Sequence, residues 1–189
     1  MVISSTSLPA VAAAYSRQFR RDFSLFLRSR AAEVVFGGRM VLTMLGREND
    51  ERSQHADRNT TLLWDLLSES LAVLVSLGMV EQGKMDAYDA PFYAPWVGEV
   101  EEEARREGSF AVSYAQVYEA NLKSGIGDAR RDRSTVAMAV RATQESILGH
   151  HFGMEIIDPL FAKYTKLVTA AMEREEIKSV QIGVVLTRL

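Results

Sequence analysis

The stretch that decides the fold is Arg39-Met40-Val41-Leu42-Thr43-Met44-Leu45-Gly46, which follows Gly37-Gly38. A short apolar run bounded by glycines is typical of a strand that is buried on both faces of a parallel sheet. The segment before it, from Ser7 to Gly37, predicts one long amphipathic helix, because its apolar residues form a wide aromatic stripe at helical spacing. The stripe consists of Val11, Tyr15, Phe19, Phe23, Phe26, Leu27 and Val34.

Helices and strands alternate through the rest of the chain. Polar residues 48–59 predict a loop, and a helix then begins at Asn59 or Thr60 and ends before Gly78. We expect further helices over 96–107, 136–148 and 156–172, strands over 110–119 and 180–186, and a loop over 123–133. This order predicts an α/β protein with part of an open sheet covered by helices on both faces. Three strands are few for so much helix, so we expect a partial domain.

Composition excludes several classes of protein. The 189 residues are 47% hydrophobic and 25% charged, which is the balance of a soluble globular protein. No apolar run approaches the ~20 residues of a membrane helix, so we expect no membrane span. A net charge of -3 with scattered basic residues does not support nucleic-acid binding. The absence of cysteine removes disulfides, thiolate nucleophiles and thiolate metal sites.

The N-terminal segment has two interpretations. Between Met1 and Ala32 there are five arginines and a single acid, Asp22, which is the composition of an organelle transit peptide. A cleaved peptide would not need three phenylalanines on one helical face, so we favour a core helix and expect a cytoplasmic location.

The sequence gives only weak indications of a dinucleotide site, a histidine metal site or a catalytic triad. Gly125-Ile126-Gly127-Asp128-Ala129-Arg130 resembles a dinucleotide-binding turn, but Arg130 replaces the third glycine, which favours a surface loop. His150 and His151 are adjacent, so on a helix they point about 100° apart and cannot hold one metal ion together. No serine lies in a nucleophile-elbow context, so we propose no catalytic triad.

Two clusters are more informative, and each has an alternative. Asp86-Ala87-Tyr88-Asp89 places two carboxylates in one turn, where they offer hard oxygen ligands to magnesium, although most acidic turns are empty. Aromatic residues around this turn are suited to enclosing a small ligand, although ordinary core packing explains the same residues and is favoured; they are Trp64, Phe92, Tyr93 and Trp96. The run Glu101-Glu102-Glu103, followed by Arg105 and Arg106, predicts a solvated helix face with opposite charges one turn apart.

Longer matches resemble the central region of the plant SABATH methyltransferases. They are Gln18–Arg30, Gly37–Thr43, Leu45–Arg47, Trp64–Leu67, Asp86–Tyr93, Glu107–Phe110, His151–Gly153 and Val184–Arg188, and they follow the family's order over nearly the whole chain. The family methylates small acids such as salicylate, benzoate, jasmonate and anthranilate, and some members methylate xanthine nitrogens.

The resemblance implies a fold. The chain is expected to be a single partial domain, 1–189, that forms the C-terminal part of a Rossmann-like class I methyltransferase sheet with three strands. Residues 60–107 are expected to form a helical substrate-binding cap inserted in it. The final strand is expected to run antiparallel between strand 39–45 and the strand near Phe110.

The resemblance also implies a function: transfer of a methyl group from S-adenosylmethionine to the carboxylate of a small plant acid. The donor site precedes this region in the family, so we expect most of it to be missing from this chain, which alone would be inactive. The full-length form is expected to be a homodimer. The alternative is a non-catalytic truncated homologue that acts as a binding or dimerisation partner.

Two sets of site residues follow from the resemblance. The acceptor-pocket wall falls on Leu45, Leu63, Trp64, Tyr93, Val140 and Thr143, where the Thr143 hydroxyl would select a more polar acid. The family's magnesium-associated signature, Asp-x-Phe-Asn, falls on Asp86, Tyr88 and Asp89, with tyrosine in place of phenylalanine and aspartate in place of asparagine.

Overall fold

The structure is a computed structural model that describes residues 9–48, 58–89, 92–122 and 129–189. Most of the predicted loop 48–59 and the glycine turn at 125–127 lie outside the described residues. The described chain divides into two compact units. The first unit contains residues 61–89, 121–122 and 129–178, and the second contains 9–48, 58–60, 92–120 and 179–189. The boundary between them runs through the segment 60–107.

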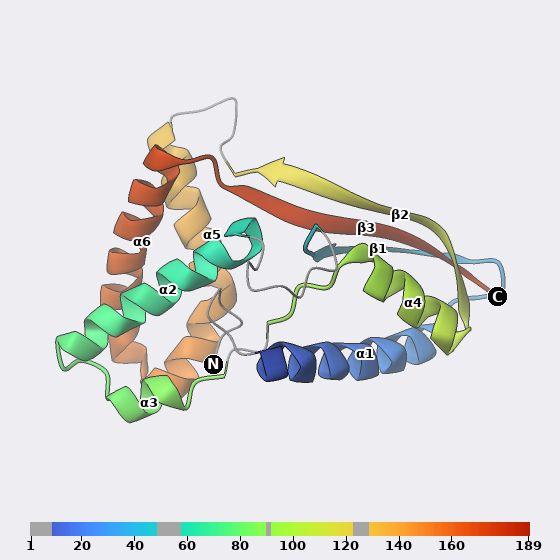
Figure 1. The fold of residues 1–189 in the computed structure, drawn as a ribbon, viewed down its shortest axis with the longest axis horizontal. Helices are drawn as coiled ribbons and strands as arrows, with labels where there is room; N and C mark the ends of the chain where they lie inside the picture. Colours follow the sequence, from blue (N-terminus) through green and yellow to red (C-terminus); the bar gives the residue numbers. More distant parts are fainter. Residues whose placement is uncertain (1–8, 49–57, 90–91, 123–128) are drawn as a thin grey trace. The chain divides into compact units, whose positions relative to one another are not determined.

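Two helices lie side by side along one face of the sheet in the second unit (Figure 1). They are α1 (Pro9–Ala31) and α4 (Val97–Glu107). The aromatic stripe of α1 packs as its spacing predicts: the rings of Phe19 and Phe23 are stacked with centroids 5.4 Å apart, and Leu27 is fully buried. Residues three and four apart share one helix face, so these side chains reach the core together.

The sheet of the second unit has the order β1-β3-β2, formed by β1 (Arg39–Leu45), β2 (Phe110–Asn121) and β3 (Lys178–Arg188). Strand β1 pairs with β3 in antiparallel register, from Arg39 opposite Thr187 to Leu45 opposite Gln181. Strand β2 also runs opposite to β3 (Figure 1). The final strand therefore lies in the centre of the three, which confirms the order and direction that the family resemblance implies.

The environment of β1 differs from the expectation of a strand buried on both faces of a parallel sheet. Its burial alternates along the strand: Met40, Leu42 and Met44 pack against the core of the unit, whereas the residues between them are exposed. Val41 keeps 69% of its surface accessible. The apolar run was correctly assigned to a strand, but a run of six apolar or weakly polar residues does not reveal that only one face is covered.

Gly108 ends α4 in a conformation that favours glycine. Its φ of 85° is left-handed, and its main-chain N–H donates to the Ala104 carbonyl. This arrangement closes the last turn of the helix. The chain then enters β2 at Phe110, which is buried with Ile182, Val184 and Leu186 of β3.

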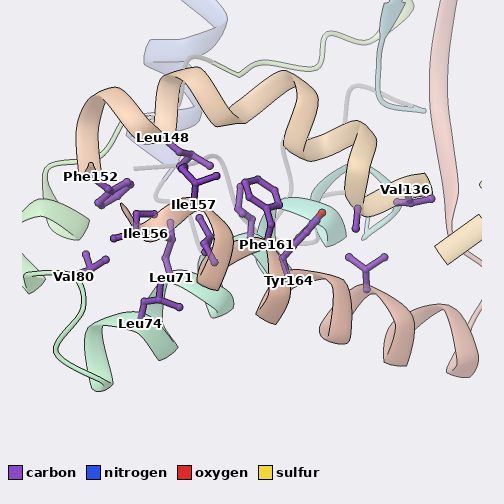
Figure 2. Close-up of a cluster of buried hydrophobic side chains, with 14 of the residues drawn as sticks. Leu71, Leu74, Val80, Val136, Leu148, Phe152, Ile156, Ile157, Phe161 and Tyr164 are labelled. Atoms are coloured by element: carbon purple, nitrogen blue, oxygen red, sulfur yellow. The ribbon is translucent and has the colours of Figure 1, made fainter. Parts of the chain in front are cut away.

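The first unit is helical and has its own core (Figures 1 and 2). Its elements are α2 (Arg58–Ser76), α3 (Gln82–Asp86), α5 (Ala129–Phe152), the 3-10 helix η1 (Met154–Ile156) and α6 (Ile157–Arg174). Leu71 and Leu74 of α2 meet Phe152 of α5 and Phe161 and Tyr164 of α6 around one apolar centre. The loop expected over 123–133 is too long, because α5 already begins at Ala129, and α3 was not expected.

In the described residues, no helix combines the length and apolarity needed to cross a membrane.

The edge position of strand β1 in the described sheet leads us to predict that the chain associates with copies of itself. Within the described residues β1 pairs on one side only and presents Val41 and Leu45 on its exposed face, and natural edge strands are normally shortened, charged or covered. We expect the 189-residue chain to elute as oligomers in size-exclusion chromatography with light scattering, and Val41→Lys to shift it toward monomer. Met138→Lys, which changes an equally exposed apolar residue on helix α5, should not. Equal oligomer fractions in both variants would contradict this role of β1.

Candidate functional site

A buried carboxylate lies in the first turn of α4 in the second unit. Glu99 is only 1% exposed. Its Oε2 accepts the main-chain N–H of Trp96 at 3.2 Å, and its Oε1 accepts the hydroxyl of Ser16, from α1, at 3.0 Å. An acidic residue at this position satisfies an otherwise unpaired N–H and interacts favourably with the positive end of the helix. Glu99 therefore fixes the start of α4 and joins it to α1.

Arg47 provides the opposite charge. It lies two residues after the end of β1, and its Nη2 lies 3.0 Å from Glu99 Oε2. Its Nη1 donates to the Ala94 carbonyl at 2.5 Å, and its main-chain N–H donates to the Pro95 carbonyl at 3.0 Å. Both charged side chains are shielded, with 16% of Arg47 and none of the Glu99 side chain exposed. Removing either partner would leave a buried charge uncompensated, which is strongly destabilising.

The hydroxyl of Tyr93 lies between these two charges. It donates to Glu99 Oε1 at 2.7 Å and accepts from Arg47 Nη1 at 3.2 Å. Burial raises the pKa of the Tyr93 phenol, the Ser16 hydroxyl lowers it, the Glu99 carboxylate raises it and Arg47 lowers it, with a net increase. The ring packs against Phe19 at 5.2 Å between centroids, and the Arg47 guanidinium lies 5.4 Å from the ring centre. Tyr93 is thus held as a neutral phenol in one orientation.

Leu45 is the other predicted wall residue in the second unit. It ends β1, two positions before Arg47, and is 51% exposed on the side of the sheet that the core does not cover. An accessible apolar side chain at a strand end has the character expected of a wall residue.

The remaining wall residues belong to the first unit. Leu63, Trp64 and Val140 are partly buried and pack against its core. The Leu63 carbonyl accepts the hydroxyl of Tyr164 at 3.2 Å, and burial raises the pKa of that phenol. These residues keep part of their surface accessible, so core packing and ligand contact are compatible at the same positions.

Thr143 is exposed on α5, but its hydroxyl serves the helix. Oγ1 donates to the Val140 carbonyl at 3.0 Å, and the Ala139 carbonyl lies at 3.3 Å. A threonine hydroxyl has a single proton, and back-bonding of this kind uses it. In this arrangement Thr143 has no donor left for a polar acceptor acid.

The acidic turn follows α3 in the first unit. Asp86 and Asp89 are exposed, and Asp86 Oδ1 accepts from Gln82 Nε2 at 2.8 Å. Tyr88 between them is 5% exposed, with its ring 5.2 Å from that of His151 and 5.1 Å from that of Phe152. His151 Nε2 also bonds the Lys84 carbonyl at 2.8 Å. The turn is therefore anchored to the end of α5 by its aromatic residue.

The donor set of this turn fits magnesium only partly. Among the residues that the structure describes, no three or more His, Cys, Asp or Glu side chains gather as a metal site. Two accessible carboxylates remain, and magnesium is commonly held by one or two carboxylates and several waters. The phenol ring of Tyr88 packs in the core of its unit, so it contributes an anchor to the turn rather than a further charged ligand.

Four residues of these arrangements were missed in the sequence: Ser16, Arg47, Glu99 and His151. Arg47 and His151 lie within stretches that resemble the family, and Glu99 had a local signal, because an acid three residues after the N-cap of a helix is at the capping-box position. The prediction of a solvated Glu101–Glu103 face is wrong at Glu103, which is 1% exposed. The predicted pairing one turn apart is present, since Arg106 binds Glu103 with Nε and Nη2 at 3.0 and 2.5 Å.

Solved structures identify the class of protein that this fold defines. The chain superimposes on a loganic acid methyltransferase, solved with SAH, with a TM-score of 0.84 and 32% identity. The match covers 100% of this chain and 52% of that one. The fold is therefore that of an α/β methyltransferase of which this chain represents about half.

The chain belongs to the family of SAM-dependent carboxyl methyltransferases, whose model matches residues 1–189. It is 39% identical to a salicylate carboxymethyltransferase from Clarkia breweri, over 98% of this chain and 53% of the relative. It is 37% identical to a 3,7-dimethylxanthine N-methyltransferase from Camellia sinensis var. assamica, over 99% of this chain and 50% of the relative. The SABATH resemblance is thus confirmed, and the chain spans about half the length of the curated relatives it matches.

Gly98 offers a test of the Glu99 region. A Cβ at this position would lie 2.0 Å from Trp96 Cη2, so the indole ring lies directly over it. We expect Gly98→Ala to displace the ring and lower the free energy of unfolding by about 1–3 kcal/mol, with a shift in tryptophan emission. Gly83→Ala, where nothing lies within 4 Å, should instead raise it by roughly 0.5 kcal/mol. Equal effects of the two changes in denaturant unfolding would rule out the close packing.

Proposed function

We propose that the chain is the acceptor-binding part of a methyltransferase that transfers a methyl group from S-adenosylmethionine to the carboxylate of a small plant acid. The observation that carries this proposal is the match of the family model to all 189 residues. The relatives support an acceptor of this kind, because one is named for salicylate and the solved neighbour for loganic acid.

The donor is proposed to bind mainly to residues outside this chain. The family resemblance places the donor loop and the ribose-binding acid before the region that the chain spans. In the transfer, a carboxylate oxygen of the acceptor forms a bond to the sulfonium methyl, and the carbon–sulfur bond breaks to leave the thioether. No protein nucleophile is required, so orientation of the acceptor and exclusion of water are what these residues contribute.

Six residues are proposed to line the acceptor wall, as the family resemblance implies: Leu45, Leu63, Trp64, Tyr93, Val140 and Thr143. The accessible surfaces of Leu45 and Trp64 offer apolar contact, and the hydroxyls of Tyr93 and Thr143 are already bonded within the protein. These positions would therefore hold the body of the acid by shape and apolar area. Residues 60–107 are proposed to act as the substrate-binding cap, although they divide between the two units.

A full-length homodimer is also proposed from the resemblance, and a cytoplasmic location from the assignment of the N-terminal segment to a core helix. The comparisons do not support the alternative of a non-catalytic binding partner, since they match the chain to catalytic relatives.

Trp64 provides the test of the acceptor wall. In an NMR titration of the 189-residue chain with salicylate, we expect Trp64→Ala to raise the Kd roughly thirtyfold, because the indole supplies about 2 kcal/mol of apolar contact. Leu77→Ala, at an exposed residue just after α2, should leave the Kd unchanged. Thermal unfolding of both variants separates binding from packing. A Trp64→Ala chain that loses stability but binds salicylate as before would contradict the wall assignment.

Magnesium is proposed to bind through the carboxylates of Asp86 and Asp89, with Tyr88 anchoring the turn between them. A bound magnesium would supply local positive charge for oxygen atoms of a ligand.

The metal proposal can be tested with manganese as a paramagnetic probe. We expect Mn²⁺ to broaden amide signals of residues 86–89 in the 189-residue chain, and the Asp86→Asn/Asp89→Asn double variant to lose this broadening, because it removes both charged ligands. Asp158→Asn is the control, since Asp158 is 86% exposed and pairs with Arg141 at 2.8 Å. Broadening that survives in the double variant would show that the turn is not the site.

A further inference from the structure

Glu99 accepts more hydrogen bonds than its role in starting a helix requires. Four donors converge on its two oxygens: the Ser16 hydroxyl, the Tyr93 hydroxyl, the Arg47 guanidinium and the Trp96 main-chain N–H. An ionised carboxylate has about four lone-pair sites, so these donors saturate it. Its partners come from α1, from the turn after β1 and from the segment before α4, which one side chain therefore holds together.

The same arrangement saturates the hydroxyl of Tyr93. Its only proton goes to Glu99, and Arg47 donates to its oxygen. A phenol has one donor and accepts well from one or two partners, so a ligand finds no free donor there. The ring is also fixed, because Phe19 packs against it and Arg47 lies near its centre.

Glu103 shows that burial alone does not produce this arrangement. It lies one turn later on the same helix and is as buried as Glu99. Its guanidinium partner, Arg106, is on the same helix, and the Arg106 side chain is 66% exposed. Glu103 thus pairs with a charge on its own helix. Glu99 and Arg47 instead bind the hydroxyl of Tyr93, a predicted wall residue. Arg47 also lies just after the end of β1, which carries a second predicted wall residue, Leu45.

We propose that Glu99 and Arg47 are positioning residues of the acceptor site: they bind the hydroxyl of Tyr93 so that Tyr93 meets the acceptor acid with its ring and not with its hydroxyl. The inference rests on the proposed function, because it requires Tyr93 to line the acceptor wall. It adds a preference for the class of acceptor, namely acids with an apolar body at this contact, since a hydrogen-bond acceptor on the acid would find no free donor there.

The first measurement examines the hydrogen-bonded group itself. In the 189-residue chain labelled with [ζ-13C]tyrosine, the Tyr93 resonance is assigned with Tyr93→Phe and titrated at alkaline pH. Glu99→Gln should lower the pKa of Tyr93, because it removes a negative charge that opposes ionisation. Arg47→Gln should raise it, because it removes a positive charge that favours ionisation. Glu103→Gln should leave it unchanged. A Tyr93 pKa that responds alike to all three changes would overturn the proposal.

The second measurement links the network to binding. With salicylate as the probe, we expect Glu99→Gln and Tyr93→Phe each to raise the Kd roughly tenfold, the effect of losing one charge-assisted hydrogen bond, with Glu103→Gln within about twofold of the wild type. If Glu99 acts through Tyr93, the double variant should be no weaker than either single variant. Additive losses in the double variant would overturn the proposal.

The two outcomes that concern function are distinguishable. A wild-type chain that binds salicylate, together with a Glu99→Gln chain that binds it equally well, would overturn this inference and leave the proposed acceptor site in place. A wild-type chain that binds no salicylate would overturn the acceptor site and this inference with it. Thermal unfolding of each variant, with Glu99→Asp as the charge-retaining replacement, shows whether a loss of binding reflects a loss of fold.

Discussion

The second unit depends on one buried ion pair, Glu99 with Arg47. Burying two charges is costly unless each finds its partner and further hydrogen bonds, and here the carboxylate has four donors. The carboxylate reaches all four donors only when α1, the turn after β1 and the segment before α4 are in place together. The pair therefore specifies one arrangement of these elements, where apolar packing alone would tolerate several.

Local pattern predicts the elements of this chain well where their period is strong. The stripe containing Phe19, Phe23 and Leu27 defines α1, and the run 39–45 defines β1, because both depend on neighbouring residues only. The burial of β1 on one face was not predictable in this way, since coverage is a property of the surrounding elements. The five-residue helix α3 was missed for a related reason: its residues, Gln82 to Asp86, are too few for a period to show.

The candidate site shows the same division between features that local sequence predicts and features that depend on distant residues. Tyr93 was assigned to the proposed acceptor wall through the family resemblance, and Asp86 and Asp89 were assigned to the proposed magnesium turn through their carboxylate chemistry. The network around Tyr93 and Glu99 was not predicted, because Arg47 lies 46 positions before Tyr93 and Ser16 lies 83 positions before Glu99, and no local pattern joins them. Glu103 was assigned to solvent because a run of acids usually lies there, yet a guanidinium one turn away allows it to be buried.

The central position of β3 has a consequence for how the sheet assembles. Arg39 in β1 pairs with Thr187, so most of the 189-residue chain separates two adjacent residues of the sheet. During synthesis, β1 leaves the ribosome long before its partner strand β3 is made, so the apolar residues of β1 cannot pair with β3 until then. Contacts between residues so far apart in sequence slow folding and favour aggregation-prone intermediates. In the helical unit, α5 and α6 are close in sequence and pack together, so this pair can form before the sheet closes around its final strand.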